Sequence, residues 1–402
     1  MATMTNEVSA PSSATHDEVV ARAREVAEAI KVDAGMADEL RRVPEASLAR
    51  VQEAGLLRTI QPRRVGGHEL SMRAHLDVIS ALAEGCGATA WVAGVGHAHS
   101  WMLGHFPNEA LREVYGDDPD TLVSAVIGPR GKAVRQADGS HVLSGFWPFA
   151  SGCHHAKWLI FGAQVFDEAG EMIDEADFLI PADQASIRDD WNVAGMQGTG
   201  SNSVTVDNVS IPPHRHLSIP ALIALETPGL DGYDGWLYRA EAVPVLSLCI
   251  TGAAIGAARA ALPEYQAAVA GKQLMYTDHV HDDYVASHIT IAEGASLIDI
   301  GEMILYRAAD DIDRFAQAGE RMPMVMRGRI RMDCAEGVRY LMEGVDKLFH
   351  TGGAAGLSLR SAMQRAWRNL HATHMHGLLA HAPSAEIYGR LLLGKEPNTP
   401  IV

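Results

Sequence analysis

The sequence predicts a mainly helical fold in three parts: an N-terminal helical domain, a central β domain and a C-terminal four-helix bundle. Three observations support this fold class. Apolar residues recur at helical spacing from 16 to 103, short segments rich in β-branched and aromatic residues cluster between 122 and 211, and four long helical patterns follow. Because the strands are clustered and do not alternate with helices, the pattern excludes a doubly wound parallel sheet.

Composition limits the function classes. The chain has 402 residues, 33 Lys and Arg against 50 Asp and Glu, a net charge of −17 and 47% hydrophobic residues. These values are typical of a soluble globular protein with more than one domain, and the acidic surface disfavours nucleic acid or an anionic membrane as partner. Four widely spaced cysteines indicate free thiols in a reducing compartment. With no targeting segment visible, we expect a cytoplasmic protein.

The first part begins with a leader over 1–14, and a helical domain is expected over 15–120. Helical spacing runs from His16 to Leu57 and is broken by Pro44. Two further helices are predicted over 72–84 and 88–103, with Pro107 opening a short third piece.

The β domain is expected over 121–216. Its predicted strands are 122–127, 141–147, 157–166, 177–181 and 203–211. Turn residues such as Asp138-Gly139 and Asp207-Asn208 separate them. A Pro- and Gly-rich linker over 217–235 leads out of this domain.

The rest of the chain, 236–402, is expected to form the bundle. Its helical segments are 236–270, 276–318, 329–350 and 358–381, with a last helix over 384–393. The longest uncharged stretch, 242–258, contains Pro244 and Gly252 and is shorter than the roughly 20 apolar residues that a bilayer requires. We therefore expect a buried core helix.

Motif searches exclude several chemistries. The nearest match to a dinucleotide fingerprint, Gly198-Thr199-Gly200-Ser201, leads into a strand and not a helix, and neither a Walker A sequence nor a GxSxG elbow occurs. Among 19 histidines, His371 and His374 share a helix face and could chelate, but the sequence offers no third ligand, so no metal is expected. His279, His281, His288, His376 and His381 are interpreted as ordinary interior or surface residues.

Several segments together resemble a known family. They are Gly145-Phe146-Trp147-Pro148-Phe149-Ala150-Ser151-Gly152, the turn Gly198-Thr199-Gly200-Ser201, Phe349-His350-Thr351-Gly352-Gly353, and Arg365-Ala366-Trp367-Arg368-Asn369 followed by His371 and His374. From about 17 to 395 the chain resembles the two-component, reduced-flavin-dependent monooxygenases with the acyl-CoA dehydrogenase fold, a group of 4-hydroxyphenylacetate, secosteroid-phenol and indole hydroxylases.

The resemblance implies an oxygenase component. Such an enzyme uses reduced flavin, FADH2 or FMNH2, and O2 as co-substrate to form a C4a-hydroperoxyflavin that hydroxylates a small aromatic substrate of the phenol or indole type. A separate NAD(P)H-dependent flavin reductase would supply the reduced flavin. The resemblance also implies a homotetramer, in which the Gly352-Gly353 turn of a neighbouring subunit completes each flavin site.

The resemblance also implies site residues. Ser151 would face flavin N5, with Trp147 and Phe149 as walls of the ring; a serine that only binds backbone at a strand end is the alternative for Ser151. His374 and His99 would act on the substrate's proton, with His97 the alternative to His99 and His371 beside His374. The other implied residues are Ser124 and Trp101 for the substrate (Trp101, like Trp91, is otherwise a core residue), and Gly198, Thr199, Ser201, Lys272, Gly352 and Gly353 for the cofactor.

Two departures bear on the alternatives. True acyl-CoA dehydrogenases carry a catalytic glutamate near the end of the bundle, where this chain has His371-Ala372-Thr373-His374-Met375-His376-Gly377 and no acid. Lys272 stands where the family usually has an arginine. Lysine keeps the positive charge but cannot form the bidentate contact with the flavin phosphate. The alternatives left open are an acyl-CoA dehydrogenase-like FAD oxidoreductase, an N-oxygenase of an amino sugar, and a helical scaffold without catalysis.

Overall fold

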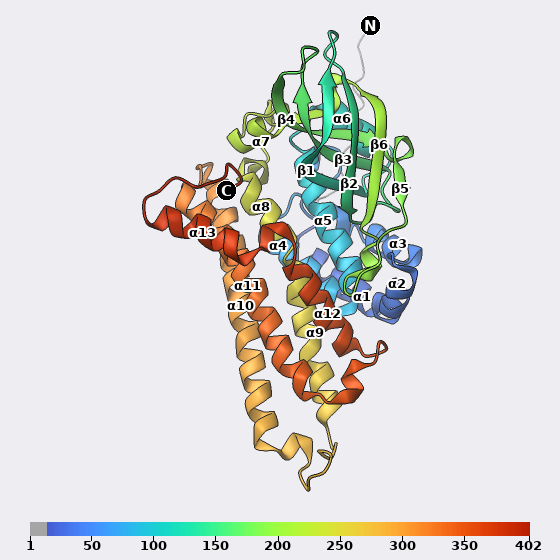
Figure 1. Ribbon diagram of the computed structural model, residues 1–402, viewed down its shortest axis with the longest axis vertical. Coiled ribbons are helices and arrows are strands. Elements are labelled where there is room, and N and C mark those ends of the chain that lie inside the picture. Colours follow the sequence, from blue (N-terminus) through green and yellow to red (C-terminus); the bar gives the residue numbers. More distant parts are fainter. Residues whose placement is uncertain (1–13) are drawn as a thin grey trace.

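The computed structural model describes residues 14–402, so the leader predicted over 1–14 lies outside the described residues except for Ala14. It has the predicted fold class. In Figure 1 the β domain occupies the upper part, the N-terminal helices lie beside and below it, and the C-terminal helices extend downward as a long bundle. Within the described residues the strands of the β domain form one hydrogen-bonded sheet of seven, which surrounds a core that includes Trp147, Phe161, Phe178 and Val204.

From residue 14 onward, six α-helices form the N-terminal part. They are α1 His16–Ile30, α2 Ala34–Leu40, α3 Glu45–Glu53, α4 Met72–Gly85, α5 Gly87–Leu103 and α6 Asn108–Tyr115. Local chemistry sets their starts: Thr15 and Glu18 form a capping box at α1, and the Ser71 side chain caps α4. Helix α5 is buried along nearly its whole length, so its polar side chains point into protein and not into solvent.

Seven strands form the sheet, in the order β5-β6-β2-β1-β3-β4-β7. They are β1 Val123–Arg135, β2 His141–Ala150, β3 Trp158–Phe166, β4 Met172–Pro181, β5 Ser186–Arg188, β6 Asn202–Ile211 and β7 His216–Ser218. Only β1 and β3 pair in parallel; the other neighbours are antiparallel. The register of β2 against β6 shifts between Trp147 and Ala150, which bends the end of β2 that leads to Ser151.

The segment predicted as a linker is held firmly by the N-terminal part. It contains β7 and helix α7 Ile219–Ala224, followed by a loop to 235. The Arg64 guanidinium donates to the carbonyl oxygens of Gly229 and Gly104 at 2.7 and 2.6 Å, and the hydroxyl of Tyr233 binds the Glu69 carboxylate. These contacts fix the loop beside α5.

Six helices follow the linker: α8 Ala242–Cys249, α9 Gly252–Val269, α10 Val285–Ala318, α11 Met324–Thr351, α12 Ala362–His374 and α13 His381–Leu392. Three predicted helices were too long. The segment 236–270 is interrupted at Ile250 and Thr251, and 276–284 forms a turn with a bridge between Gln273 and Val280. The segment 358–381 is helical only from Ala362 to His374. Residues 242–269 are apolar and long enough to cross a membrane, but 83% of their most apolar window is buried inside the protein.

Glycines allow α10 and α11 to pack closely along their length. A Cβ on Gly301 would lie 2.7 Å from the Gly337 carbonyl oxygen, and a Cβ on Gly344 would lie 2.8 Å from that of Gly294. Neither distance is sterically possible for a real side chain, so the contact requires glycine at these positions. The result is a stiff two-helix arm, visible at the lower left of Figure 1.

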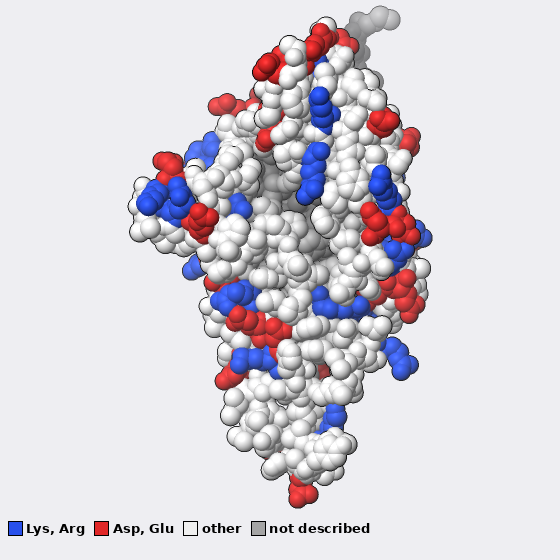
Figure 2. Space-filling view, in the orientation of Figure 1, with Lys and Arg blue, Asp and Glu red and all other residues white. Residues whose placement is uncertain are grey.

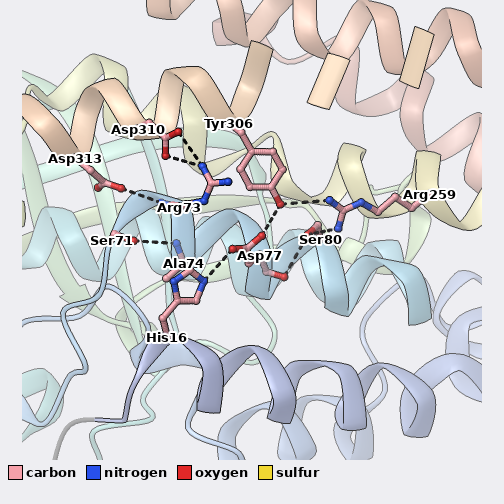
Figure 3. A network of polar contacts seen from close by, with 10 residues as sticks. All are labelled: His16, Ser71, Arg73, Ala74, Asp77, Ser80, Arg259, Tyr306, Asp310 and Asp313. Carbon is pink, nitrogen blue, oxygen red and sulfur yellow. Dashed lines mark hydrogen bonds and ion pairs between the residues drawn. The ribbon is translucent and has the colours of Figure 1, made fainter. Parts of the chain in front are cut away.

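A polar network joins the N-terminal domain to the bundle (Figure 3). The Asp77 carboxylate on α4 accepts from the Tyr306 hydroxyl at 2.6 Å and contacts His16 Nε2 at 2.9 Å. Arg259 on α9 forms a bidentate pair with Glu302 and reaches the Tyr306 hydroxyl. Residues from α1, α4, α9 and α10 are therefore linked across the domain boundary, which holds the two domains in one arrangement.

Asp313 is the most buried acid of this joint, and it predicts a pH dependence. Its carboxylate, 7% exposed, accepts from the backbone N–H groups of Met72 and Arg73 at the start of α4. Burial nevertheless raises its pKa to about 6. In the unfolded chain the Asp313 carboxyl ionises near pH 4, so between pH 4 and 6 the folded state binds more protons than the unfolded state. As pH rises through that window, the contribution of Asp313 to the unfolding free energy therefore falls by about 2–3 kcal/mol.

Asp313→Asn should remove this part of the pH dependence. Thermal and denaturant unfolding from pH 4.5 to 7 would measure it, with Asp207→Asn, at an exposed position of the β domain, as control. Parallel pH profiles of the parent and Asp313→Asn would contradict the assignment.

Candidate functional site

The predicted serine lies in a strained turn at the end of β2. Phe149 has φ +71° although it is not glycine, Gly152 also has φ +71°, and the Ser151 N–H donates to the Phe149 carbonyl oxygen at 3.0 Å. The Ser124 hydroxyl donates to the Ser151 carbonyl at 2.8 Å, and the Gly152 N–H donates to that of Thr199 at 2.9 Å. The turn therefore holds the Ser151 side chain at the edge of the β domain.

The Ser151 hydroxyl lies where the N-terminal helices meet the β domain. The Trp91 indole N–H on α5 donates to Ser151 Oγ at 3.0 Å, and Ser201 Oγ lies 2.7 Å from it. Ser201 Oγ lies 2.6 Å from Thr199 Oγ1 in the turn before β6. The structure thus brings together three residues that the sequence placed in the site, and adds Trp91, which it had left as a core residue.

His99 and His97 differ in what their ring nitrogens contact. His99 Nδ1 lies 2.7 Å from the Val123 carbonyl oxygen, so Nδ1 carries the proton and Nε2 presents a lone pair. His97 is fully buried, with Nε2 on the Leu56 carbonyl and Nδ1 on His75 Nδ1. Burial lowers the pKa of each to about 4. His97 is therefore engaged on both sides by the core, whereas His99 keeps one nitrogen for a ligand.

His376, just after the end of α12, lies beside Trp91, although the sequence analysis gave it no role in the site. The His376 ring centroid lies 5.9 Å from that of Trp91, and burial lowers the His376 pKa to about 4. His371 instead binds the Asp346 carboxylate at 2.8 Å. His374 Nε2 is buried without a partner, and the pKa of His374 is lowered by burial and by His371.

The end of α12 explains why His376 was missed. The helix stops at His374, and His376 begins a short turn in which its Nδ1 accepts from the Leu378 N–H at 3.3 Å. Helical spacing therefore does not apply to His376, although a continuous helix was predicted to 381. The available signal was Gly377, a weak helix former directly after it.

Two aromatic residues predicted for the site belong to the core. Trp147 is fully buried, donates to the Gly162 carbonyl at 2.8 Å and stacks on Phe161, so it does not wall an open site. Trp101 is fully buried and donates to the Leu237 carbonyl at 3.2 Å, so it does not contact substrate. Phe149, by contrast, is 63% exposed and can face a ligand.

The remaining predicted residues form two groups. Gly198 packs against Ala37 and Ala88 near Ser201, where a Cβ would lie 2.8 Å from each neighbour. Lys272 donates to the Gly352 carbonyl at 3.3 Å, beside Gly353. This second group lies at the lower end of the bundle in Figure 1, remote from the end of β2. One copy of the chain therefore does not bring Lys272, Gly352 and Gly353 to Ser151.

The surface is hollowed at the domain junction. Figure 2 shows a recess where the β domain meets the helices below it, with Lys and Arg side chains along one border and uncharged residues along most of the rest. Two other cavities, of about 320 and 370 Å³, lie at the far end of the sheet beside His141 and His216 and on the bundle beside Asp346 and His350. Among residues 14–402, no group of three or more His, Cys, Asp or Glu is arranged to hold a metal.

Comparisons with known proteins agree with this architecture. The family described as acyl-CoA dehydrogenase, N-terminal domain, matches 13–117, and the C-terminal domain of the same family matches 248–381. The chain is 35% identical to the flavin-dependent monooxygenase, oxygenase subunit HsaA, of Rhodococcus jostii, over 84% of this chain and 88% of that protein. It is 31% identical to the FADH(2)-dependent resorcinol hydroxylase, oxygenase component, of a Rhizobium species, over 95% and 96%.

A solved structure gives the same result in three dimensions. The HsaA monooxygenase from Mycobacterium tuberculosis superposes with a TM-score of 0.91 at 30% identity, over 97% of this chain and all of that one. The residues around Ser151 fit a flavin: Phe149 offers an exposed apolar ring, and the Ser151 hydroxyl offers a polar contact for one edge of a planar cofactor.

Proposed function

The chain belongs to the oxygenase components of two-component flavin-dependent monooxygenases, and we propose that it hydroxylates a small aromatic substrate, a phenol or an indole, in a site built around Ser151. The single observation that carries this placement is the junction at Ser151, where the strained end of β2 meets Trp91 of α5. The resorcinol hydroxylase among its relatives supports a phenolic substrate. The histidines at 371–377 supply no carboxylate base, which disfavours acyl-CoA dehydrogenation.

The enzyme uses reduced flavin and O2. Reduced flavin, when bound, activates O2 so that one oxygen atom can pass to an electron-rich ring. A separate NAD(P)H-dependent flavin reductase supplies it in our proposal, which the term "oxygenase subunit" in the name of a relative supports. The four cysteines are all unpaired and buried, which favours a reducing, cytoplasmic site of action.

The chain's own residues bind and orient the reactants. Ser151 binds the flavin ring at N5, and Phe149 packs on it. His99, neutral at pH 7, accepts the phenol O–H or indole N–H at Nε2, because its Nδ1–H is held by the Val123 carbonyl. His376 offers its Nε2–H as a hydrogen-bond donor to the reactants, because its Nδ1 accepts from the Leu378 N–H. The buried helix α5 excludes water from this side.

A substrate panel tests the activity. The chain, supplied with FAD or FMN, NADH and a flavin reductase, should convert a phenol or an indole into a hydroxylated product that carries ¹⁸O from ¹⁸O2. The label follows because one atom of O2 enters the ring. Oxidation of acyl-CoA without O2, and no labelled aromatic product, would contradict the proposal.

Histidine variants test the assignment of the site. His99→Ala and His376→Ala should each lower the hydroxylation rate by about 10²-fold or more, since a positioned acid or base contributes about 10²–10⁴-fold. His374→Ala is the matched control from the same stretch, and its rate should stay within a few-fold of the parent rate. Mass spectrometry of product and titration of released hydrogen peroxide measure both outcomes. The reverse order of effects would return the role to His374.

We also propose a homotetramer. The arm formed by α10 carries the exposed apolar side chains of Val285, Ile289 and Met303, which share one helix face at single-chain exposures of 62%, 54% and 63%. Assembly would cover this face, and it would bring the Gly352-Gly353 turn and Lys272 of one subunit toward the flavin of another.

Light scattering at micromolar concentration should therefore give about four times the chain mass of 43.2 kDa. Ile289→Glu should lower the measured mass, because it places a charge in the covered face. Glu171→Lys, at an exposed turn of the β domain away from this helix, is the control. A parent mass near that of a single chain would contradict the proposal.

A further inference from the structure

A cavity of about 320 Å³ lies at the end of the sheet that is opposite Ser151. Strand β2 begins at His141, which lines this cavity, and ends at Ala150, next to Ser151. An extended strand of this length separates its two ends by about 30 Å. The volume falls within the range of small-molecule pockets, and no residue assigned to flavin or substrate lines it. The cavity is therefore separate from the proposed active site.

Two stacked histidines form one wall of the cavity. The His141 and His216 rings are nearly parallel, at an interplanar angle of 9° with their centroids 4.9 Å apart, and both contact Phe178 of the β core. His141 is 5% exposed, and its Nδ1 is buried without a hydrogen-bond partner among residues 14–402. Because a buried polar atom without a partner is costly, the His141 ring lacks a contact that a ligand could supply.

The charged residues of the cavity differ in how far they are already paired. Asp174 Oδ1 accepts from the Glu175 N–H at 2.8 Å and from the Ser218 hydroxyl at 3.1 Å, and Asp174 Oδ2 lies 3.6 Å from His216 Nε2. Arg135 at the end of β1 is exposed and forms no ion pair within the described part of the chain. Its guanidinium is free for an anion, and a carboxylate matches it with two parallel hydrogen bonds.

The other walls are apolar, which limits the kind of anion that fits. Val165, Ile173 and Pro213 line the cavity, and Val165 belongs to the β core. These side chains favour a ligand that carries hydrocarbon as well as charge. The stacked rings disfavour a metal, since a metal lies in the plane of the imidazole that ligates it and two parallel rings cannot share one ion.

We propose that this cavity is a second binding site, which takes a small carboxylate on an apolar body, with Arg135 binding the carboxylate and His141 donating a further hydrogen bond to it. The apolar body would lie against Val165, Ile173 and Pro213. The site goes beyond the proposed hydroxylation and does not depend on it.

Binding at this site should take up a proton. The charged or titratable groups that line it are Arg135 of β1, His141 of β2, Asp174 of β4 and His216 of β7. With both imidazoles neutral, Arg135 and Asp174 cancel, so a bound carboxylate leaves one negative charge.

A proton on His141 offsets that negative charge. Burial, the His216 ring and Arg135 lower the pKa of His141 to about 4, and a bound anion opposes this shift. His216 already has Asp174 beside it. Affinity should therefore rise as pH falls.

Calorimetric titration of the full chain with benzoate tests the site. Benzamide lacks the charge and acetate lacks the ring, so benzoate should bind about tenfold or more tighter than either. Arg135→Gln should weaken benzoate about tenfold or more, while Arg24→Gln, at an exposed position of α1, should leave it unchanged. Thermal unfolding monitors the fold of each variant. Benzoate binding that Arg135→Gln does not weaken, or no binding by the parent, would overturn the inference.

The pH dependence tests His141. From pH 8 to 5.5 the dissociation constant of benzoate should fall about threefold or more, and titrations in buffers of different ionisation enthalpy should show proton uptake. His141→Phe keeps a ring against His216 but cannot take the proton, so it should remove both effects, whereas His216→Phe should retain them. The reverse order, or a parent without pH dependence, would overturn the role of His141.

The hydroxylation assay separates this inference from the proposed function. Because the cavity is remote from Ser151, Arg135→Gln should hydroxylate at the parent rate. A parent that binds benzoate as expected but hydroxylates no substrate would overturn the proposed function alone.

Discussion

The arrangement at the site depends on one backbone carbonyl, that of Met196. Its residue adopts φ +55°, in the left-handed region, and its oxygen accepts from the Trp191 indole and from the Thr199 hydroxyl. Its N–H is held by Asn369 of α12. Strain of this kind persists only where the surroundings over-determine the conformation. Here the β domain and the C-terminal bundle both hold the turn, so the position of Thr199 and Ser201 beside Ser151 requires that the two are correctly packed.

A second set of contacts holds the N-terminal domain against the C-terminal bundle. The network around Asp77 and Tyr306 ties α4 to α10, and α4 packs against α5, which carries Trp91 and His99 (Figure 3). The pairs in these joints are distant in sequence, and several of their members are buried. Because a buried polar group is costly unless it is paired, each joint penalises displacement of one domain from the other. The site at their intersection is therefore preorganised in the chain itself.

The sequence could predict the elements because they depend on local pattern: periodicity located α4 and α5 within two residues at each end. One side of the site came from the family resemblance, which pointed to Thr199 and Ser201, residues that do lie beside Ser151. Trp147, which the resemblance placed beside the flavin, is instead buried against Phe161. The register of β2 shifts between Trp147 and Ala150, so Trp147 and Ser151 do not follow one strand alternation.

His376 shows a further limit. Its position depends on where α12 ends, and helix ends are determined by capping contacts rather than by periodicity.

Backbone contacts also determine which ring nitrogen of each histidine carries the proton. No pattern of residue types encodes this. The Val123 carbonyl forces the proton of His99 onto Nδ1, and the Leu378 N–H forces the lone pair of His376 onto Nδ1. Their free nitrogens are consequently opposite in kind, one an acceptor and one a donor, although the side chains are identical and both have a pKa of about 4. Backbone groups remote from the reacting atoms thus decide which way each hydrogen bond in the site can run, and a change in backbone position alone could reverse it.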